Sequence, residues 1–271
     1  MNRVAAIQMV STADVEANLA CARELIAEAA GLGAQLIVLP EFFPLLCQDG
    51  RAKLGIAEAP GDGPIQSFLS ENARRHGIWL VGGTIPLHGP DADHVYNSSL
   101  VFNSAGECTA RYDKMHLFDV YVDRDREEQY NESATMAPGA EAVVADTPFG
   151  KIGLSVCYDL RFPELYRRMC AEGAEIFTAP SAFTDRTGRA HWEMLVRARA
   201  VENLCFMIAP GQGGQHNEQR LTWGHTMIVD PWGDILCALQ RGPGVACAEL
   251  DMERLRSLRA SFPVLKHRRL D

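Results

Sequence analysis

Hydrophobic and polar positions alternate in two ways along the chain. Short apolar runs at residues 3–9 (RVAAIQM) and 34–40 (AQLIVLP) have the length of strands, whereas residues 15–33 carry apolar side chains three and four positions apart, as an amphipathic helix does. Glycine ends this helix and Pro40 ends the second strand. By the same criteria, strands are predicted at 79–87, 97–103, 108–114, 142–159 (a hairpin), 175–180, 204–210, 224–240 (a second hairpin) and 245–251, and helices at 64–76, 161–174, 190–203 and 252–263.

The order of these elements predicts the fold class. Strands that alternate with helices, mixed with strands joined directly as hairpins, are typical of mixed sheets covered by helices on their outer faces, so the chain is predicted to be α/β. Residues 120–133 (VYVDRDREEQYNES) are highly charged and without period, which indicates an exposed loop. No repeat or linker marks a boundary, and residues 1–271 are predicted to form one domain.

Composition and charge exclude several classes of function. The net charge is -9, and no run rich in Lys and Arg precedes the short KHRR tail, which argues against a nucleic-acid partner. No apolar run approaches the roughly 18 residues of a membrane helix, and no signal peptide is recognisable, so a cytoplasmic location is expected. The eight cysteines include no CxxC pair and no zinc-ligand spacing, which predicts mostly buried, reduced thiols and no metal.

Cys157 lies where the apolar strand KIGLSV meets the start of a predicted helix at residues 158–163. Such an elbow exposes a side chain at the sheet edge and points backbone N–H groups at a developing oxyanion. The dipole at a helix start is also expected to lower the pKa of a thiol and so raise its thiolate fraction. Two interpretations are open at this point, a buried structural cysteine and a catalytic nucleophile.

Two charged residues lie at predicted strand ends. Glu41 follows the strand at 34–40, and Lys114 ends the strand at 108–114. Because burying an unpaired carboxylate is costly, Glu41 is expected at the mouth of a cleft or in a salt bridge. If both residues meet Cys157, Glu41 would transfer protons and Lys114 would stabilise a tetrahedral oxyanion. The histidines single out no base.

Three segments, LPEFF, YDKMHLFD and GLSVCYDLRFPELYR, resemble the nitrilase, or carbon-nitrogen hydrolase, superfamily, whose triad is Glu, Lys and Cys in that chain order. The resemblance runs from AAIQM through AHWEMLVRARAVEN to GHTMIVDPWG, which is nearly the whole chain. It implies a four-layer α-β-β-α sandwich of mixed sheets, with Glu41 as general base, Lys114 as oxyanion stabiliser and Cys157 as nucleophile. It also implies no metal or organic cofactor and a homodimer or higher homo-oligomer, with residues 161–170 and 191–203 at the interface.

The resemblance assigns roles to two further residues. The backbone N–H of Tyr158 would complete the oxyanion hole, and Glu132 would position the substrate and the lysine. Arg161 and Asp159, which follow the nucleophile, are interpreted as structural residues that are salt-bridged near the elbow.

The segments PSAFTDRTGRAHWE and GQGGQHNEQRLTWGHTMIVDPWG look most like the branch that contains ω-amidases and deaminated-glutathione amidases, and GQHNEQR is closer to the latter. The implied substrate is therefore a small carboxylated amide, most closely deaminated glutathione, in a metabolite-repair reaction. Cationic side chains would bind its carboxylates, and Arg186, Arg189 and Arg220 lie in the appropriate loops.

Several alternatives share the same triad. An ω-amidase that acts on 2-oxoglutaramate and an N-carbamoyl amino acid amidohydrolase would need the same residues. A nitrilase proper is disfavoured, since family nitrilases typically read Cys-Trp-Glu where this chain has Cys157, Tyr158 and Asp159. Outside the enzymes, the alternative is a catalytically silent binding protein of this fold. The presence of all three residues, Glu41, Lys114 and Cys157, counts against it.

Overall fold

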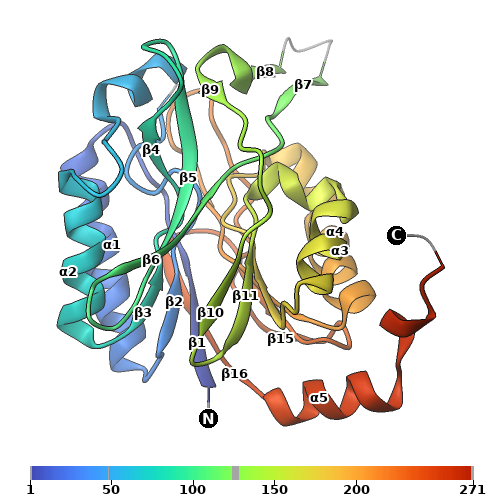
Figure 1. The fold of residues 1–271 in the computed structure, drawn as a ribbon. Coiled ribbons are helices and arrows are strands. Elements are labelled where there is room, and N and C mark those ends of the chain that lie inside the picture. The colour runs from blue at the N-terminus through green and yellow to red at the C-terminus, as the bar shows by residue number, and fades with distance from the viewer. Residues whose placement is uncertain (1, 48, 124–127, 270–271) are drawn as a thin grey trace.

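Two mixed β-sheets, packed against each other, form the centre of the computed structural model, which describes residues 2–47, 49–123 and 128–269 (Figure 1). The first sheet has the order β16-β1-β2-β3-β5-β4, and β6 and β9 also pair with β5. Its strands are β1 (Asn2–Gln8), β2 (Leu36–Val38), β3 (Trp79–Val81), β4 (Ile85–His88), β5 (Val95–Phe102), β6 (Cys108–Asp113), β9 (Met136–Ala137) and β16 (Gly244–Leu250).

The second sheet has the order β10-β11-β12-β13-β14-β15. Strands β11, β12 and β13 are parallel to one another, and the outer pairs are antiparallel, so this sheet is also mixed. Its strands are β10 (Val144–Thr147), β11 (Gly150–Leu154), β12 (Ile176–Thr178), β13 (Phe206–Ala209), β14 (Met227–Val229) and β15 (Ile235–Ala238).

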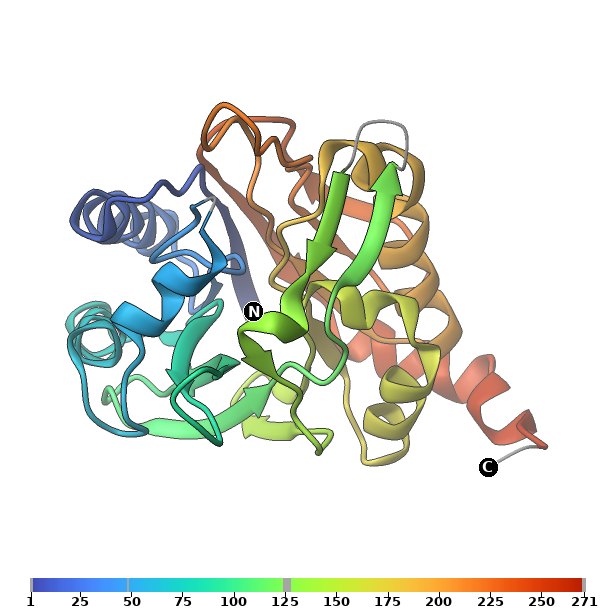
Figure 2. The ribbon, with the colours of Figure 1, turned by 90° about the horizontal axis from the view of Figure 1, so that it is seen from above.

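Helices cover the outer face of each sheet. Viewed from above, α1 and α2 lie beside the first sheet and α3 and α4 beside the second, which confirms the predicted α-β-β-α layering (Figure 2). The last helix, α5, extends from β16 below the second pair. The helices are α1 (Val15–Gly31), α2 (Pro64–His76), α3 (Pro163–Ala171), α4 (Asp185–Asn203) and α5 (Met252–Ser261), and the 3-10 helices are η1 (Gly50–Ile56), η2 (Glu132–Ala134), η3 (Cys157–Arg161) and η4 (Val264–His267).

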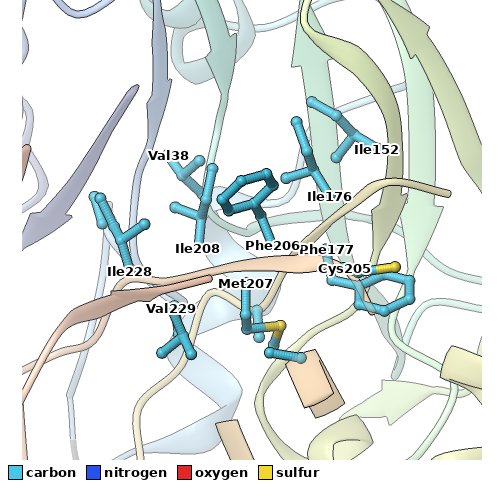
Figure 3. Packing of buried hydrophobic residues seen from close by; sticks show 14 of the residues in the cluster. Val38, Ile152, Ile176, Phe177, Cys205, Phe206, Met207, Ile208, Ile228 and Val229 are labelled. Carbon is cyan, nitrogen blue, oxygen red and sulfur yellow. The ribbon is translucent and has the colours of Figure 1, made fainter. Parts of the chain in front are cut away.

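Strand residues alternate between two apolar layers because successive side chains point to opposite faces of a sheet. In β1, Val4 and Ala6 face the second sheet, whereas Ala5 and Ile7 pack with the apolar faces of α1 and α2. In β13, Phe206 and Ile208 lie on the side of Val38 and Met207 on the other (Figure 3). Both faces of the central strands are therefore buried, which is why their sequences are continuous apolar runs.

The parallel strands bring the candidate residues to one edge. Helix α1 connects β1 to the parallel β2, and α3 connects β11 to the parallel β12. Glu41 lies three positions after the end of β2, and Cys157 lies three positions after the end of β11. Loops at the carboxyl ends of parallel strands are where α/β proteins bind ligands, so the two sheets place both side chains at a common edge.

The single strand predicted at residues 79–87 is two strands, β3 and β4, and both pair with β5. Gly83 lies between them with a left-handed backbone (φ 54°), and a Cβ there would lie 2.1 Å from the carbonyl oxygen of Pro40. The chain bends at this glycine because no other residue would fit so close to the loop that carries Glu41.

Helix α4 begins five residues before the predicted start at 190. Thr184 caps it, accepting a hydrogen bond from the backbone N–H of Thr187 at 3.1 Å. Gly188, which weakens the helical pattern in the sequence, lies against Trp223, where a Cβ would be only 2.2 Å from the Cβ of the tryptophan. This glycine is needed for close packing and does not end a helix.

Residues 120–133 are predicted to be an exposed loop; in the part that the structure describes, the side chains are half-buried or exposed, but the loop is wrong, and residues 124–127 lie outside the described part. Strands β7 (Asp119–Asp123) and β8 (Glu128–Asn131) form an antiparallel hairpin in which Val120 faces Tyr130. The Tyr130 ring packs on Phe118 with ring centroids 5.1 Å apart. A short two-stranded arm buries too few residues to produce a periodic apolar pattern, and its charges dominate the sequence.

All eight cysteines are free thiols, as predicted. The expectation that most of them are buried is wrong, because only Cys157 and Cys205 are. In the part of the chain that the structure describes, no helix has the length and apolarity needed to cross a bilayer.

Candidate active site

A cavity of about 690 Å³ opens between the loops at the carboxyl ends of β2 and β11. It is large enough for a small organic substrate. Predicted site residues that line it are Glu41, Lys114, Glu132, Cys157, Tyr158 and Arg220. The sequence-based expectation that the three separated motifs meet at one cavity is therefore fulfilled in the structure.

Lys114 lies between two carboxylates at the floor of this cavity. Its Nζ is 3.0 Å from Oε1 of Glu41, and 2.9 Å and 2.8 Å from Oε1 and Oε2 of Glu132. The side chains of Lys114 and Glu41 are only 2% and 1% exposed, so the charges are held out of water. Burial alone lowers the pKa of Lys114, but Glu132 and Glu41 outweigh this effect and raise that pKa well above its ordinary value. Lys114 is therefore a permanent cation.

Cys157 sits beside Glu41 on a strained backbone. Its φ of 50° is left-handed, which is rare for a residue with a Cβ and is found at functional sites. Burial raises the pKa of the Cys157 thiol, and the nearby Glu41 carboxylate raises it further; Lys114 and a hydrogen bond from the backbone of Ala182 lower it by less. The pKa is therefore well above its ordinary value, and the sulfur is a neutral thiol near pH 7.

The expectation that a helix dipole lowers the pKa of this thiol is wrong. The segment after Cys157 is a 3-10 helix of five residues, η3, and α3 begins only at Pro163. So short a helix contributes little dipole, whereas removing a thiolate from water beside a carboxylate is costly. Nucleophilic attack would then require Glu41 to accept the thiol proton in the same step.

This charge state can be tested spectroscopically. The far-ultraviolet difference spectrum between the wild-type protein and Cys157→Ala should show no thiolate absorbance appearing between about pH 6 and about pH 8, because the Cys157 thiol stays protonated over that range. The difference removes the contribution of the other seven cysteines. A titration step centred below pH 7 would instead mean that a thiolate is formed in advance.

A buried hydrogen-bond network holds the elbow. Oδ2 of Asp159 accepts from the hydroxyl of Tyr112 at 2.7 Å and from the backbone N–H of Val156 at 2.8 Å. Its Oδ1 is 2.7 Å from Nδ1 of His116. Asp159 is completely buried, and these donors satisfy its carboxylate. The interpretation of Asp159 as a structural, salt-bridged residue agrees with this geometry.

The three predicted carboxylate-binding arginines are placed differently. Arg220 lines the cavity, donates to the carbonyl oxygen of Ala182 at 3.0 Å, and lies 4.6 Å from the Tyr130 ring centroid. Arg186 and Arg189 are exposed on the first turns of α4, and neither is among the described residues that line the cavity. They were assigned to a loop, but the early start of α4 turns them away.

Arg161 also lines the cavity, where its guanidinium lies 5.7 Å from the ring centroids of both Tyr158 and Phe183. The predicted salt bridge of Arg161 is not found among the described residues; its guanidinium is instead 3.3 Å from Nδ1 of His191. Arg161 therefore forms part of the wall, held by two rings and a histidine.

Lys53, on η1, was missed by the sequence analysis. It lines the cavity with its Nζ 4.2 Å from the Phe42 ring centroid. Burial lowers the pKa of Lys53, and the positive charge of Arg220 lowers that pKa further. Among described residues, no carboxylate oxygen lies within 4.0 Å of Lys53 or Arg220. Two cations thus face the same cavity without a described carboxylate partner.

Across residues 2–47, 49–123 and 128–269, no group of three or more His, Cys, Asp or Glu side chains is arranged to hold a metal ion. The expectation that the protein uses no metal or cofactor stays a prediction.

Comparisons with known proteins identify the family of this chain. The family model described as carbon-nitrogen hydrolase matches residues 3–260. The deaminated glutathione amidase of Yersinia enterocolitica is 43% identical over 267 residues, which cover 98% of this chain and 92% of that protein.

Two solved structures extend the comparison to the fold. The crystal structure of the Caenorhabditis elegans NitFhit protein superposes with a TM-score of 0.89 at 38% identity, covering 99% of this chain and 65% of that longer one. A mutant amidase from Nesterenkonia sp. AN1, solved with acrylamide added to its active site cysteine, has a TM-score of 0.79 at 28% identity and covers 97% of this chain and 99% of that one. By the extent of the family match and the identity to the Yersinia protein, this chain belongs to the carbon-nitrogen hydrolase family.

Proposed function

We propose that this protein is an amidase that hydrolyses a small carboxylated amide through a thioester on Cys157. Glu41 acts as the proton-transfer group, Lys114 stabilises the tetrahedral oxyanion, and Glu132 holds Lys114 in place. The observation that carries the proposal is that Glu41, Lys114 and Cys157 line one cavity, in which the buried Glu41 carboxylate lies 3.0 Å from the Lys114 ammonium.

The reaction follows from the protonation states. Glu41 accepts the proton of the thiol as sulfur attacks the amide carbon, and then gives it to the leaving nitrogen, so that ammonia or an amine departs. Water then attacks the thioester carbonyl and passes a proton to Glu41. The C–S bond breaks, the acid is released, and Glu41 gives that proton to the sulfur, which restores the thiol. One carboxylate therefore serves both half-reactions.

The hydrogen bonds of Lys114 limit how it acts. An ammonium has three N–H donors, and here three carboxylate oxygens accept from them. Lys114 stabilises the oxyanion chiefly through its positive charge, and a direct hydrogen bond requires one of its two bonds to Glu132 to be exchanged. The backbone N–H of Tyr158, which lines the same cavity, is proposed as the second oxyanion donor.

The substrate class is supported by charge. Lys114 is neutralised by two carboxylates, whereas Lys53 and Arg220 have no described carboxylate partner and face the cavity. A substrate carboxylate would relieve their repulsion and gain charge-assisted hydrogen bonds. Deaminated glutathione, the substrate named for the Yersinia relative, carries such carboxylates, and we propose it as the substrate.

A product-release assay tests this proposal. The purified protein is given deaminated glutathione, 2-oxoglutaramate, an N-carbamoyl amino acid and a simple nitrile, and specificity constants are compared. Deaminated glutathione is expected to be hydrolysed with the highest value. A higher value for 2-oxoglutaramate would assign an ω-amidase, one for the carbamoyl compound an amidohydrolase of that class, and binding without turnover of any of them would indicate a silent binding protein.

Removing either cavity cation should weaken substrate binding more than chemistry. Lys53→Met and Arg220→Met are each expected to raise KM for a carboxylated amide by about 10-fold or more with a smaller change in kcat, because a charge-assisted hydrogen bond contributes about 1.5–3 kcal/mol. Arg189→Met, which alters an exposed arginine outside the cavity lining, is the control and should leave KM unchanged. Equal KM values for all three would show that the carboxylate binds elsewhere.

Three broader features belong to the same proposal. Residues 1–271 form one domain, the protein acts in the cytoplasm, and it forms a homodimer through α3 and α4. Free cysteines support the location.

Met194 and Val201 on α4, which are 61% and 43% exposed, support the interface. Light scattering at micromolar concentration should give the mass of a dimer rather than that of a 29.8 kDa monomer.

A further inference from the structure

We propose that Asn97 is a positioning residue that fixes Glu41 and Glu132 on either side of Lys114 and so directs the second oxygen of Glu41 toward Cys157. This inference rests on the proposed function, because it assigns to Asn97 the task of orienting the proposed proton-transfer group. Asn97 lies in β5 and is 2% exposed.

The side chain of Asn97 bridges the two carboxylates. Its Nδ2 donates to Oε1 of Glu41 at 3.0 Å and lies 3.4 Å from Oε1 of Glu132. The same two oxygens accept from Nζ of Lys114 at 3.0 Å and 2.9 Å. Two donors and two acceptors thus form a closed ring, in which neither carboxylate can rotate without losing both of its bonds in that ring.

The backbone of Asn97 also holds Lys114, the other donor of the ring. The backbone N–H of Lys114 donates to the carbonyl oxygen of Asn97 at 2.9 Å. This bond continues the antiparallel pairing of β5 with β6, in which Ser98 faces Asp113. One residue of the sheet therefore sets the position of Lys114 through its main chain and that of the carboxylates through its side chain.

The carbonyl oxygen of the Asn97 amide indicates the role of this side chain. Oδ1 of Asn97 is buried and has no hydrogen-bond partner among the described residues. An ionised carboxylate only accepts hydrogen bonds, so the NH₂ end must face Glu41 and Glu132. Leaving a buried carbonyl oxygen unpaired is costly, which indicates that the amide is placed to use its N–H groups at the site.

The ring determines which oxygen of Glu41 is free. Oε1 already accepts from Lys114 and Asn97, which leaves Oε2 as the oxygen available to Cys157 in the same cavity. Without Asn97, the plane of the Glu41 carboxylate would be held at Oε1 by Lys114 alone and could turn away about its last bond. The contact with the thiol would then be made in only part of the molecules.

The experiment compares Asn97→Leu with Asn72→Leu. Asn72 on α2 is a matched control because it is also buried, also has an unpaired Oδ1, and donates to a backbone carbonyl, that of Phe68, at 2.8 Å. It does not line the cavity. Asn97→Asp is the second test variant, since it keeps the shape of the side chain and replaces a donor with a third carboxylate.

Two readouts are measured for each variant. The first is kcat and KM as a function of pH. Besides Glu41, the ionisable groups that face this ring are Lys114, Glu132, Cys157 and Lys53. The second is the rate at which iodoacetamide alkylates Cys157, followed by mass spectrometry. The alkylation rate requires no amide substrate, so it tests the positioning role of Asn97 even if the proposed hydrolysis is not observed.

Asn97→Leu is expected to lower kcat by about 10-fold or more with little change in KM, to move the acid limb of the pH profile to higher pH, and to slow alkylation of Cys157 to a similar extent. Asn97→Asp should lower kcat further. Asn72→Leu should leave pH profile and alkylation unchanged. Folded Asn97 variants with wild-type pH profiles and alkylation rates would overturn the inference, as would effects equalled by Asn72→Leu. Normal turnover in such a case would leave the proposed hydrolysis standing.

Discussion

Replacing Cys157 with alanine is expected to lower amide turnover by about 10⁴-fold or more, because the proposed reaction passes through a thioester on this sulfur, which lines the cavity with Glu41 and Lys114. The substitution removes one buried sulfur and no charge, since the thiol is neutral. The protein should therefore fold, and it should still bind substrate through Lys53 and Arg220. Turnover and substrate binding are measured separately, by product release and by calorimetry.

The control for this prediction is Cys108→Ala, which removes an exposed thiol and should leave the rate unchanged. With Cys157→Ser, the less acidic hydroxyl should give little or no turnover while preserving shape and hydrogen bonding. Appreciable activity of Cys157→Ala would remove this residue as the nucleophile and would leave a water-mediated mechanism to be sought at Glu41.

Replacing Lys114 with methionine is expected to have the second largest effect. The rate should fall by about 100-fold or more, which corresponds to about 2.7 kcal/mol of lost oxyanion stabilisation. Stability should also fall by about 3–5 kcal/mol, because Glu41 and Glu132 would remain buried without their cation. Rate is measured under saturating substrate, and stability by urea unfolding.

A double variant separates these two effects. Lys114→Met combined with Glu132→Gln removes one cation and one carboxylate together, so that part of the lost stability should return. The rate should stay low, because the positive charge near the developing oxyanion is still missing. If the rate recovered with stability, Lys114 would be a structural residue of the cavity floor and not a participant in the reaction.

The sequence predicts the chemistry of this site better than its shape. Glu41 and Lys114 follow strands of the first sheet and Cys157 follows a strand of the second, each in a recognisable motif, and the ends of these strands meet at one cavity. Lys53 and Asn97 carry no such signal. Lys53 lies in a 3-10 helix with no apolar period, and Asn97 lies within a strand where a buried polar side chain interrupts the pattern. Their roles depend on contacts with segments distant in sequence, which periodicity does not report.

The fold shows a similar division. Helix α2 has the predicted bounds of 64–76, because apolar spacing, Pro64 at its first turn and a left-handed Gly77 at its end agree. The start of α4 and the break between β3 and β4 depend instead on Gly188 and Gly83, whose neighbours, Trp223 and Pro40, come from other parts of the chain. Local signals determine an element when they agree, and tertiary contacts determine it when they conflict.

The two cavity cations and the reacting groups lie on different kinds of structural element. Glu41, Lys114 and Cys157 are attached to the ends of core strands, whereas Lys53 lies on η1 and Arg220 on the turn before β14. Mutations in these two peripheral segments can change which acid is accepted without disturbing the packing that aligns thiol and carboxylate. Proteins with the same catalytic residues can therefore differ in substrate specificity. Redesign of this specificity can begin at η1 and the turn that carries Arg220, while the core remains intact.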